Sequence, residues 1–526
     1  MPRLASKANC DKNSNYFFIV SEKPKNKPIL NTAKLMITVN ALLATLVGFY
    51  FFLSPAFISL YYVMDSSFEK NEIPQFAYNS HKNISPRFEK WATDRLQQKL
   101  ALETNRLDVI SNEWPLFSAY WYLQASLQIE QELKKIDTPK EELPSYYAKS
   151  AIESAIRIIT DKNHGNFAEA QWGDDYLTKE NVYYRTMLIG GIATHHQLTR
   201  KKKYLELLKK QSNGLLAEID ASEHGLLHDF PEEIYPGDML LALSSIKQAD
   251  TIFGVERDSV YERAKRGFLK NTDSFTDLPP YHTSQAILSF RSAPSLARGS
   301  STALLLHSAP NLWEEVSETW MNKFEEYYWL ENWTAIGFRE YPKGTPAEES
   351  QQWFWDVDAG PVLAGHGFTA SVFGCGASRK NGRYDLAYPL ATEMILLSYP
   401  LLNGGQLIAE SLSDSKHAPL VGQIGILYNL ACVSKNSHSQ PELKIPPLFW
   451  IVFSVLILVG VILIWRGIRR TRRGRDLKSP PKYLAIQFVL WALLIALSVY
   501  LFSQESYWLF FTAITVSRFF PMISRE

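Results

Sequence analysis

The sequence predicts an all-α membrane protein, an (α/α)6 toroid outside the membrane with three transmembrane helices and a candidate fourth. Three observations predict it: long uncharged apolar segments, helical spacing of the other apolar residues, and charge sorted between segments. The net charge of +1 is a cancellation, because residues 1–34 hold seven Lys/Arg and two Asp/Glu, 64–446 hold 38 and 49, and 466–482 hold eight and one. Such sorting excludes a simple soluble protein and a disordered one. The large acidic block would repel phosphate, so nucleic acid is not an expected partner.

Three apolar segments are long enough to cross a bilayer, for which a helix needs about 20 residues. Residues 35–63, 447–465 and 483–502 contain no charge. Their length disfavours the alternative that they are core helices. A cleaved signal peptide fits the first segment poorly, since the apolar core of a signal peptide spans only about 7–15 residues. We therefore expect three transmembrane helices and the lipid bilayer as a partner.

Basic residues beside these segments predict the orientation, because Lys and Arg are retained on the cytoplasmic side. The arm 1–34 carries Lys23, Lys25, Lys27 and Lys34, and the loop 466–482 reads RGIRRTRRGRDLKSPPK. Placing both in the cytoplasm puts residues 64–446 outside. We expect a multi-pass protein of the cell (inner) membrane, with a cytoplasmic N-terminus and a large extracytoplasmic, periplasmic domain.

Two features near the C-terminus leave alternatives open. In the segment 503–526, ten apolar residues from Tyr507 to Val516 precede Arg518, so this stretch is either a fourth membrane helix or an interfacial segment. The basic loop 466–482 either marks topology, the favoured interpretation, or binds anionic lipid headgroups, to which each Lys or Arg contributes about 1 kcal/mol.

Residues 64–446 show helical periodicity almost throughout, and strand-like alternation is scarce. About a dozen helices joined by loops with Pro, Gly and aromatic residues favour paired helices closing into a ring of six hairpins over an open bundle. A superhelical repeat stack is the competing architecture, but no fixed-period self-similarity supports it. The predicted helices are Phe88 to Leu107, Leu116 to Leu133, Tyr146 to Ile159, Val182 to Leu198, Tyr204 to Ile219, Asp238 to Ile252, Val260 to Leu269, Ser301 to Leu306, Trp313 to Trp329, Gly360 to Ser378, Tyr384 to Leu401 and Leu420 to Cys432.

The three cysteines point to little chemistry. Cys10 is cytoplasmic on this topology, and Cys375 and Cys432 share the outer compartment. These two form either one disulfide or, as we favour from their apolar surroundings, buried free thiols. No CxxC or HExxH pattern is present, so we expect no zinc site and no cofactor.

A first candidate site lies in the loop Gly173 to Arg185. Its adjacent carboxylates, Asp174 and Asp175, are candidates for general acid and base, with Tyr184 as a further catalytic candidate and Tyr183 as a substrate-binding one. In the alternative interpretation, an acidic residue here only favours a helix N-terminus, where it meets the positive end of the helix dipole.

A second candidate site is the loop HGLLHDFPEEIYPGD, residues 224–238. Its two prolines prevent a helix and stiffen the loop, which would present His228 and Glu232 as catalytic candidates and Tyr235 as a binding candidate. Asp238 directly precedes an apolar run, so we favour a helix N-cap role for it. The alternative for His228 is an exposed loop histidine.

The third candidate site is the richest in chemistry. Aromatic side chains beside carboxylates can stack on sugar rings or enclose an apolar ligand, and an extended segment would let Asp356 and Asp358 face one cavity. In the alternative, Asp358 caps a helix that starts at Gly360 and the tryptophans belong to the core. We assign Asp356 and Asp358 to catalysis, and to substrate binding Arg298, Arg339, Glu340, Trp355 and His366.

Three stretches carry a family resemblance. They are NVYYRTMLIGGIATHHQLTRKKKYLELL (181–208), GLLHDFPEEIYPGDMLLALSSIKQAD (225–250), and FREYPKG followed by DVDAGPVLAGHGFTASVFGCGASRKNGRYDLAYPLA. Together they resemble the linalool dehydratase/isomerase-like domain of bacterial membrane proteins, over roughly Glu113 to Cys432. The resemblance implies an (α/α)6 toroid.

The resemblance also implies a chemistry. The family's namesake adds and removes water on a monoterpene alcohol without a cofactor, using Asp, His, Tyr and Cys side chains in a central cavity. The resemblance offers Asp174, Asp175, Tyr183 and Tyr184 as counterparts of the acid and tyrosine elements. The pair of pocket cysteines has no counterpart, because Ser300 and Ser301 occupy the opening of the following helix and Cys375 lies in an apolar run.

Two classes of function follow. The first is a cofactor-independent acid–base enzyme, a lyase/isomerase or a glycan-active hydrolase, acting on a small hydroxylated molecule or a glycan in the toroid cavity. The second is a non-catalytic envelope module that binds a glycan or another membrane protein.

Overall fold

The computed structural model describes residues 27–105, 108–284, 287, 295–333, 335–414, 416–434, 445–475, 483–503, 507–517 and 519–520. Cys10 and most of the arm 1–34 lie outside these ranges, as do residues 476–482 of the basic loop. The chain divides into two compact units, Met1–Phe49 with Gly460–Glu526, here the terminal unit, and Tyr50–Val459, here the central unit. The protein is mostly helical, as the sequence predicts.

Three helices are apolar and long enough to cross a membrane, and they overlap the three segments that the sequence predicts. The candidate spans are Pro28–Val63, Pro447–Arg472 and Leu484–Ser503. The first joins α1 (Lys27–Gly48), the π-helical turn η1 (Phe49–Leu53) and α2 (Ser54–Val63), while the other two lie in α20 (Pro447–Arg475) and α21 (Leu484–Ser503). The first part of the predicted basic loop is thus a continuation of α20, because no proline interrupts the chain between Pro447 and Arg475.

The last helix, α22 (Tyr507–Ser517), has eleven residues and a length of about 16 Å. It is therefore shorter than the roughly 30 Å hydrocarbon core of a bilayer. A polar contact joins the helices of the terminal unit: the buried Asn40 of α1 donates to the Phe520 carbonyl (2.6 Å) and accepts from the Trp491 indole of α21 (2.8 Å). An amide inside an apolar span thus has its hydrogen bonds satisfied.

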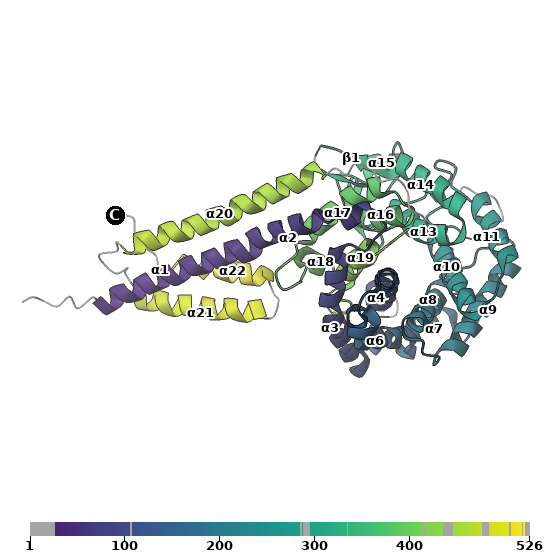
Figure 1. The fold of residues 1–526 in the computed structure, drawn as a ribbon, viewed down its shortest axis with the longest axis horizontal. Coiled ribbons are helices and arrows are strands. Elements are labelled where there is room, and N and C mark those ends of the chain that lie inside the picture. Colours follow the sequence, from purple (N-terminus) through teal and green to yellow (C-terminus); the bar gives the residue numbers. More distant parts are fainter. Residues whose placement is uncertain are drawn as a thin grey trace, which may run out of the picture. The chain divides into compact units, whose positions relative to one another are not determined.

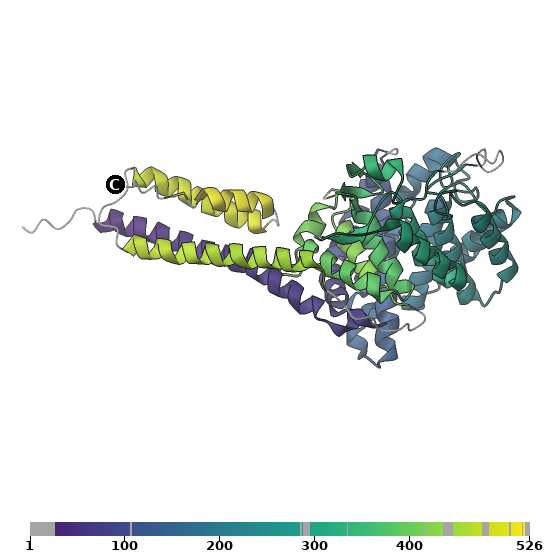
Figure 2. The ribbon, with the colours of Figure 1, turned by 90° about the horizontal axis from the view of Figure 1, so that it is seen from above.

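Within the terminal unit, α1 runs beside the second half of α20 (Figures 1 and 2). A Cβ atom placed on Gly48 would lie 3.0 Å from the Gly460 carbonyl oxygen, and one placed on Gly467 would lie 3.0 Å from that of Ala41. Glycines thus allow the two backbones to approach closely, the packing expected of helices in lipid.

Six helices of the central unit pack in series. In the order α4, α8, α10, α13, α16 and α19, each packs against the next, and α19 packs against α4 (Figure 1). Further helices pack on their outer sides, for example α6 on α4 and α14 on α13. The larger helices of this unit are α3 (Gln75–Gln97), α4 (Val109–Lys135), α6 (Lys149–Thr160), α7 (Asn166–Trp172), α8 (Val182–Thr199), α9 (Leu205–Ala221), α10 (Pro236–Phe253), α11 (Asp258–Lys270), α13 (Gly299–Leu312), α14 (Glu314–Tyr328), α16 (Phe368–Lys380), α17 (Tyr384–Ser398) and α19 (Val421–Leu430).

Helix α8 shows why this sequence packs tightly. It is buried on nearly all sides, as its continuous apolar sequence suggests. A Cβ atom on Gly190 would lie 2.6 Å from the Tyr120 ring of α4, and one on Gly191 would lie 2.6 Å from Ile159 of α6. The two glycines therefore let α8 pack directly against both neighbours.

Two predicted helices were placed wrongly. The helix expected from Phe88 to Leu107 is α3, which starts after Pro74 and ends where Lys99 takes a left-handed φ of 53°. The helix expected from Gly360 begins only at Phe368, because Gly360 and Gly365 have positive φ values of 62° and 82° that no α-helix contains.

Short strands precede α16. Trp353–Asp356 (β3), Gly360–Leu363 (β4) and His366–Gly367 (β5) form an antiparallel sheet, and Trp329–Glu331 (β1) pairs with Ile336–Phe338 (β2). The sequence interpretation took the β4 and β5 residues as helix because their apolar residues match both periods over so short a run. Cys375 and Cys432 are buried and free, which confirms the favoured interpretation over a disulfide.

Candidate functional site

The central unit encloses a cavity of about 670 Å³. The first turns of α4, α8, α10, α13, α16 and α19 contribute to its wall, so polar residues far apart in the sequence meet there. Aromatic rings make up much of the remaining wall. They are Trp114, Phe117, Trp121, Phe167, Tyr183, Phe230, Tyr235, Tyr281, Trp355, Phe368 and Phe373.

Three carboxyl groups in the cavity wall form its chemical centre. Glu113 comes from the second turn of α4, Asp238 from the first turn of α10, and Asp358 from the turn between β3 and β4. Glu113 is only 9% exposed, and its carboxyl group has no hydrogen bond or ion pair to any residue that the structure describes. A buried carboxyl group without a partner is costly, and it therefore indicates a functional role.

Burial raises the pKa of both helix-borne acids. The pKa of Glu113 lies well above its usual value because of desolvation and the nearby charges of Asp238 and Asp358. Desolvation, with the charge of Asp358, raises the pKa of Asp238 to about 7. Like charges in one cavity oppose one another's ionisation, which adds to the effect of burial on these two groups.

A second row of polar groups supports these acids. The Tyr183 hydroxyl donates to the Glu113 carbonyl (3.3 Å), and burial together with the charges of Glu113 and Asp238 raises the pKa of this tyrosine. Asp229 is 1% exposed, and its pKa is raised by burial and by Asp238. One of its oxygens accepts from the Tyr235 backbone N–H (2.8 Å), which fixes the chain just before α10.

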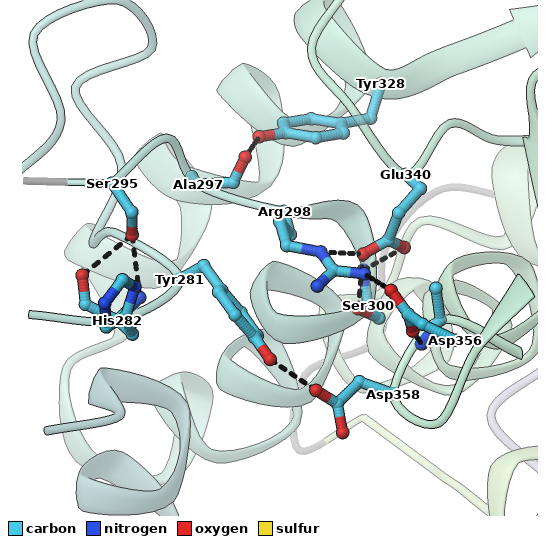
Figure 3. Close-up of polar contacts among 11 residues, drawn as sticks. Tyr281, His282, Ser295, Ala297, Arg298, Ser300, Tyr328, Glu340, Asp356 and Asp358 are labelled. Atoms are coloured by element: carbon cyan, nitrogen blue, oxygen red, sulfur yellow. Dashed lines mark hydrogen bonds and ion pairs between the residues drawn. The ribbon is translucent and has the colours of Figure 1, made fainter. Parts of the chain in front are cut away.

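Arg298 links the hairpin that carries Asp358 to the rest of the unit (Figure 3). Its guanidinium donates to the buried Glu340 (2.6 Å) and to Asp356 (2.7 Å), and it lies over the Tyr281 ring at 4.5 Å. Glu340 is 0% exposed, and burial raises its pKa to about 7 although Arg298 acts in the opposite direction. Glu340 also accepts from the hydroxyl and backbone N–H of a serine at the start of α13 (2.7 and 3.1 Å).

This network ends at the cavity. Tyr281 donates a hydrogen bond to Asp358, which orients that carboxylate in the wall (Figure 3). Asp356 accepts from the Ala359 backbone N–H (2.5 Å) and so holds the turn between β3 and β4 in shape. Arg298 therefore positions the turn with Asp358 without itself lining the cavity.

The structure brings some of the predicted site residues together. Asp358, Tyr183, Tyr235 and Trp355 line the cavity. Asp356, Arg298 and Glu340 form the supporting ion-pair network beside it. Asp356 and Asp358 do not face the cavity together, because only Asp358 belongs to its wall. The other candidates lie outside this wall: Asp174, Asp175, Tyr184, His228, Glu232, Arg339 and His366.

Of the predicted site residues outside the cavity wall, those of the first candidate site lie either in an exposed turn or in the packed core. Asp174 and Asp175 are exposed in a turn, where Asp175 pairs with Lys179 (3.1 Å). Tyr184 is 3% exposed and packs edge-on against Phe167.

In the second loop, His228 and Glu232 likewise lie outside the cavity wall. His228 Nδ1 bonds the Glu180 carboxylate (2.6 Å), which makes it a partnered residue and not a free loop histidine. Glu232 is exposed at a positive φ of 71°, the strained tip of the turn.

Arg339 pairs with Glu348 (3.3 Å). His366 Nε2 bonds the Asn332 amide (3.0 Å), and burial lowers its pKa to about 4.

The sequence interpretation missed Glu113 and Tyr281 and assigned Asp238 a different role. Asp238 is the third residue of α10, whose N-cap is Tyr235, so the N-cap assignment is wrong. Asp358 caps no helix either, because β4 follows it. A signal for Glu113 did exist: it is the one charged residue between Val109 and Ile129, in a stretch rich in apolar and aromatic residues.

The cavity wall is strongly biased in charge. Five acidic side chains line it, Asp108, Glu113, Glu233, Asp238 and Asp358, and no Lys, Arg or His is among the lining residues that the structure describes. Within the same part of the chain, no three His, Cys, Asp or Glu side chains converge as metal ligands would. In sequence comparison, no protein-family model and no curated protein matches the chain.

Proposed function

We propose that the central unit is an (α/α)6 toroid held on the extracytoplasmic side of the cell membrane by the three apolar helices. The closed series of packed helices from α4 to α19 supports the toroid, and the basic residues around the second and third spans support the orientation. The likeness to linalool dehydratase/isomerase-like domains agrees with both and stays a prediction. A reporter fused after Arg475 should report a cytoplasmic location, and an extracytoplasmic one would contradict the orientation.

For its activity, we propose a cofactor-independent acid–base enzyme whose active site is the cavity of the central unit. The observation that supports this most is the buried Glu113 carboxyl group, which has no partner among the described residues and lines the cavity together with Asp238 and Asp358. Titratable groups with strongly shifted pKa values inside a cleft are typical of active sites.

The environments of the acids assign their roles in this proposal. Glu113, whose pKa burial raises well above its usual value, is the acid that donates its proton to a leaving oxygen of the substrate. Asp238, with a pKa of about 7, is available as the base, and Tyr281 orients Asp358 as a further carboxylate. Loss of the protonated oxygen leaves positive charge on the substrate, which ionised carboxylates and aromatic faces stabilise.

The wall favours a hydroxylated substrate with an apolar or ring-shaped face. Rings such as Trp121 and Trp355 can stack on it, and the cavity has room for a drug-sized molecule or a short glycan. The reaction class is therefore hydration and dehydration or glycoside hydrolysis. In the first, water adds to or leaves the substrate. In the second, water enters after the glycosidic oxygen is protonated.

A non-catalytic binding module is the second candidate function. It is favoured by three exposed tryptophans, Trp333, Trp353 and Trp355, which are 81%, 71% and 59% exposed. Exposed aromatic rings of this size are typical of surfaces that bind glycans or partner proteins.

Variants of the acids separate the two candidates. The full-length protein in neutral detergent would be incubated with short neutral and amino-substituted glycans and with unsaturated alcohols, and gain or loss of water followed by mass spectrometry. We expect Glu113→Gln and Asp238→Asn each to lower the rate roughly 100-fold or more. Asp174→Asn and Asp175→Asn are matched controls, being exposed and outside the cavity, and should leave it unchanged.

The same variants would be tested for complementation in a strain that lacks the gene. Full complementation by both Glu113→Gln and Asp238→Asn would contradict the catalytic proposal. Loss of complementation with unchanged folding would contradict a purely structural role for the cavity.

A further inference from the structure

We infer that the ligand of this cavity is a positively charged organic molecule, an amine or quaternary ammonium compound that also carries a hydroxyl group. The inference names the ligand class for the cavity and rests on the proposal that the cavity is the functional site. It stands on three features: the charge of the wall, the unpartnered Glu113 carboxyl group, and the aromatic rings beside it.

The charge of the wall is the first feature. Its five acidic side chains face no basic side chain among the described lining residues, and the nearby Arg298 is already paired with Glu340 and Asp356. An anionic ligand would meet only repulsion from these side chains, whereas a cation would be attracted by several of them.

Helix ends could offset this negative charge, since first turns carry partial positive charge. At three of these helix N-termini, a carboxyl group of the protein already lies beside the first turn. Asp108 caps α4 by accepting from the Ser111 backbone N–H (3.3 Å), Glu340 accepts from the first turn of α13, and Asp238 lies in the first turn of α10. Among the described residues, Glu113 and Asp358 have no cationic partner, so a cation on the ligand would be the first counter-charge that their carboxyl groups meet.

Glu113 is the second feature and points directly to a ligand. It is more than nine-tenths buried, it lines the cavity, and nothing in the described part of the chain bonds its carboxyl group. An ammonium group would supply the missing partner. A hydroxyl group on the same ligand would reach Asp238 or Asp358.

The aromatic wall is the third feature. Faces of Trp, Tyr and Phe attract cations, and quaternary ammonium groups are bound in proteins by cages of such rings. Trp114, Trp121, Tyr183 and Tyr281 lie in the same wall as the three acids. Since the acids do not converge as metal ligands within the described chain, the space between them suits an organic cation better than a metal ion.

Proton linkage adds a signature to this binding. The groups that face Asp238 are Glu113 on α4, Tyr183 on α8, Asp229 in the preceding loop and Asp358 in the hairpin turn. Because burial raises the pKa of Asp238 to about 7, this group ionises as the pH rises through neutrality. A permanently charged ligand should therefore bind more tightly at pH 8 than at pH 6.

A matched set of probes tests the inference on the full chain in neutral detergent. Choline carries a permanent charge and a hydroxyl group, 3,3-dimethylbutan-1-ol is its neutral isostere, and 3,3-dimethylbutanoate is an anion of the same size. Calorimetric titration should show choline binding at least tenfold more tightly than the alcohol, and no binding of the anion. Choline affinity should rise at least threefold from pH 6 to pH 8.

Variants place the binding in the cavity. Asp238→Asn should lower the affinity for choline at least tenfold and remove its pH dependence. Glu113→Gln should lower the affinity for choline but leave the pH dependence in place. Asp175→Asn, outside the cavity, should change neither. Equal affinity for choline and the alcohol, preferred binding of the anion, or no binding of choline would each overturn the inference.

The outcome is separable from that of the proposed function. If Asp238→Asn abolishes turnover while choline and the alcohol bind equally, the enzyme proposal stands and the charge preference fails. If choline binds in the cavity while both acid variants keep full complementation, the cation inference stands and the catalytic proposal fails.

Discussion

Two groups of acids in the central unit differ in almost every physical respect. Asp174 and Asp175 are neighbours in sequence, lie exposed in one turn, and contact solvent and Lys179. Glu113, Asp238 and Asp358 are more than 100 residues apart from one another and meet in the wall of one cavity. In the second group, burial takes the carboxyl groups of Glu113 and Asp238 out of water and raises the pKa of both.

The comparison teaches that density of acids along the chain is a poor guide to a site. A run of adjacent polar residues usually marks a surface turn, in which all of them are exposed to solvent. A single acid within an apolar helix, such as Glu113, carries more information, since its burial must be offset by something.

The largest expected effect is on the ion-pair network beside the cavity. Arg298→Met should lower the free energy of unfolding by about 3–5 kcal/mol, because it leaves the Glu340 charge buried without its partner. Chemical denaturation of the full-length protein in detergent would measure it. Combining the change with Glu340→Gln should recover part of the loss, and a purely additive double variant would contradict the pairing.

An intermediate effect is expected from pH. The folded-state pKa of Asp238 is about 7 against an unfolded value near 4, so the folded protein holds this proton where the unfolded chain has released it. Its contribution to stability is complete at acidic pH and is lost as the pH rises toward and through about 7, by about 2 kcal/mol between pH 5 and pH 8. Unfolding measured across this range should show a smaller loss in Asp238→Asn. If the free energy of unfolding of Asp238→Asn depended on pH as that of the unchanged protein does, Asp238 would not differ from the exposed acids as described.

The smallest effect is expected in the exposed turn. Asp175→Asn removes an ion pair in which both side chains are more than half exposed, so the free energy of unfolding should change by less than about 1 kcal/mol. Thermal unfolding at low and high salt would measure it. A change as large as that of Arg298→Met would show that the two groups of acids do not differ as described.

The sequence predicted much of the secondary structure for identifiable reasons. Uncharged runs of about 20 residues can hardly be anything but membrane helices, and all three reappear as candidate spans. Helices with a strong pattern, such as α8 and α10, were predicted to within a few residues. The hairpin Trp353 to Leu363 was taken in part as helix, since positive φ values at glycines are not visible in an apolar run.

The site was predicted only in part. Tyr183, Tyr235, Trp355 and Asp358 line the cavity as expected of site residues, and their loops were recognisable from dense aromatic and acidic residues. Tyr281 carried no such signal, because its role depends on a hydrogen bond to a residue 77 positions away.

By itself the sequence determined the helical class, the apolar spans and the acidic character of the large central block, since these depend on local spacing and composition. Only the tertiary structure decided which acids act together. Whether a carboxyl group is buried, and which groups lie opposite it, depends on which helix N-termini come together in the folded protein. Local sequence does not encode that Glu113, Asp238 and Asp358 line one cavity.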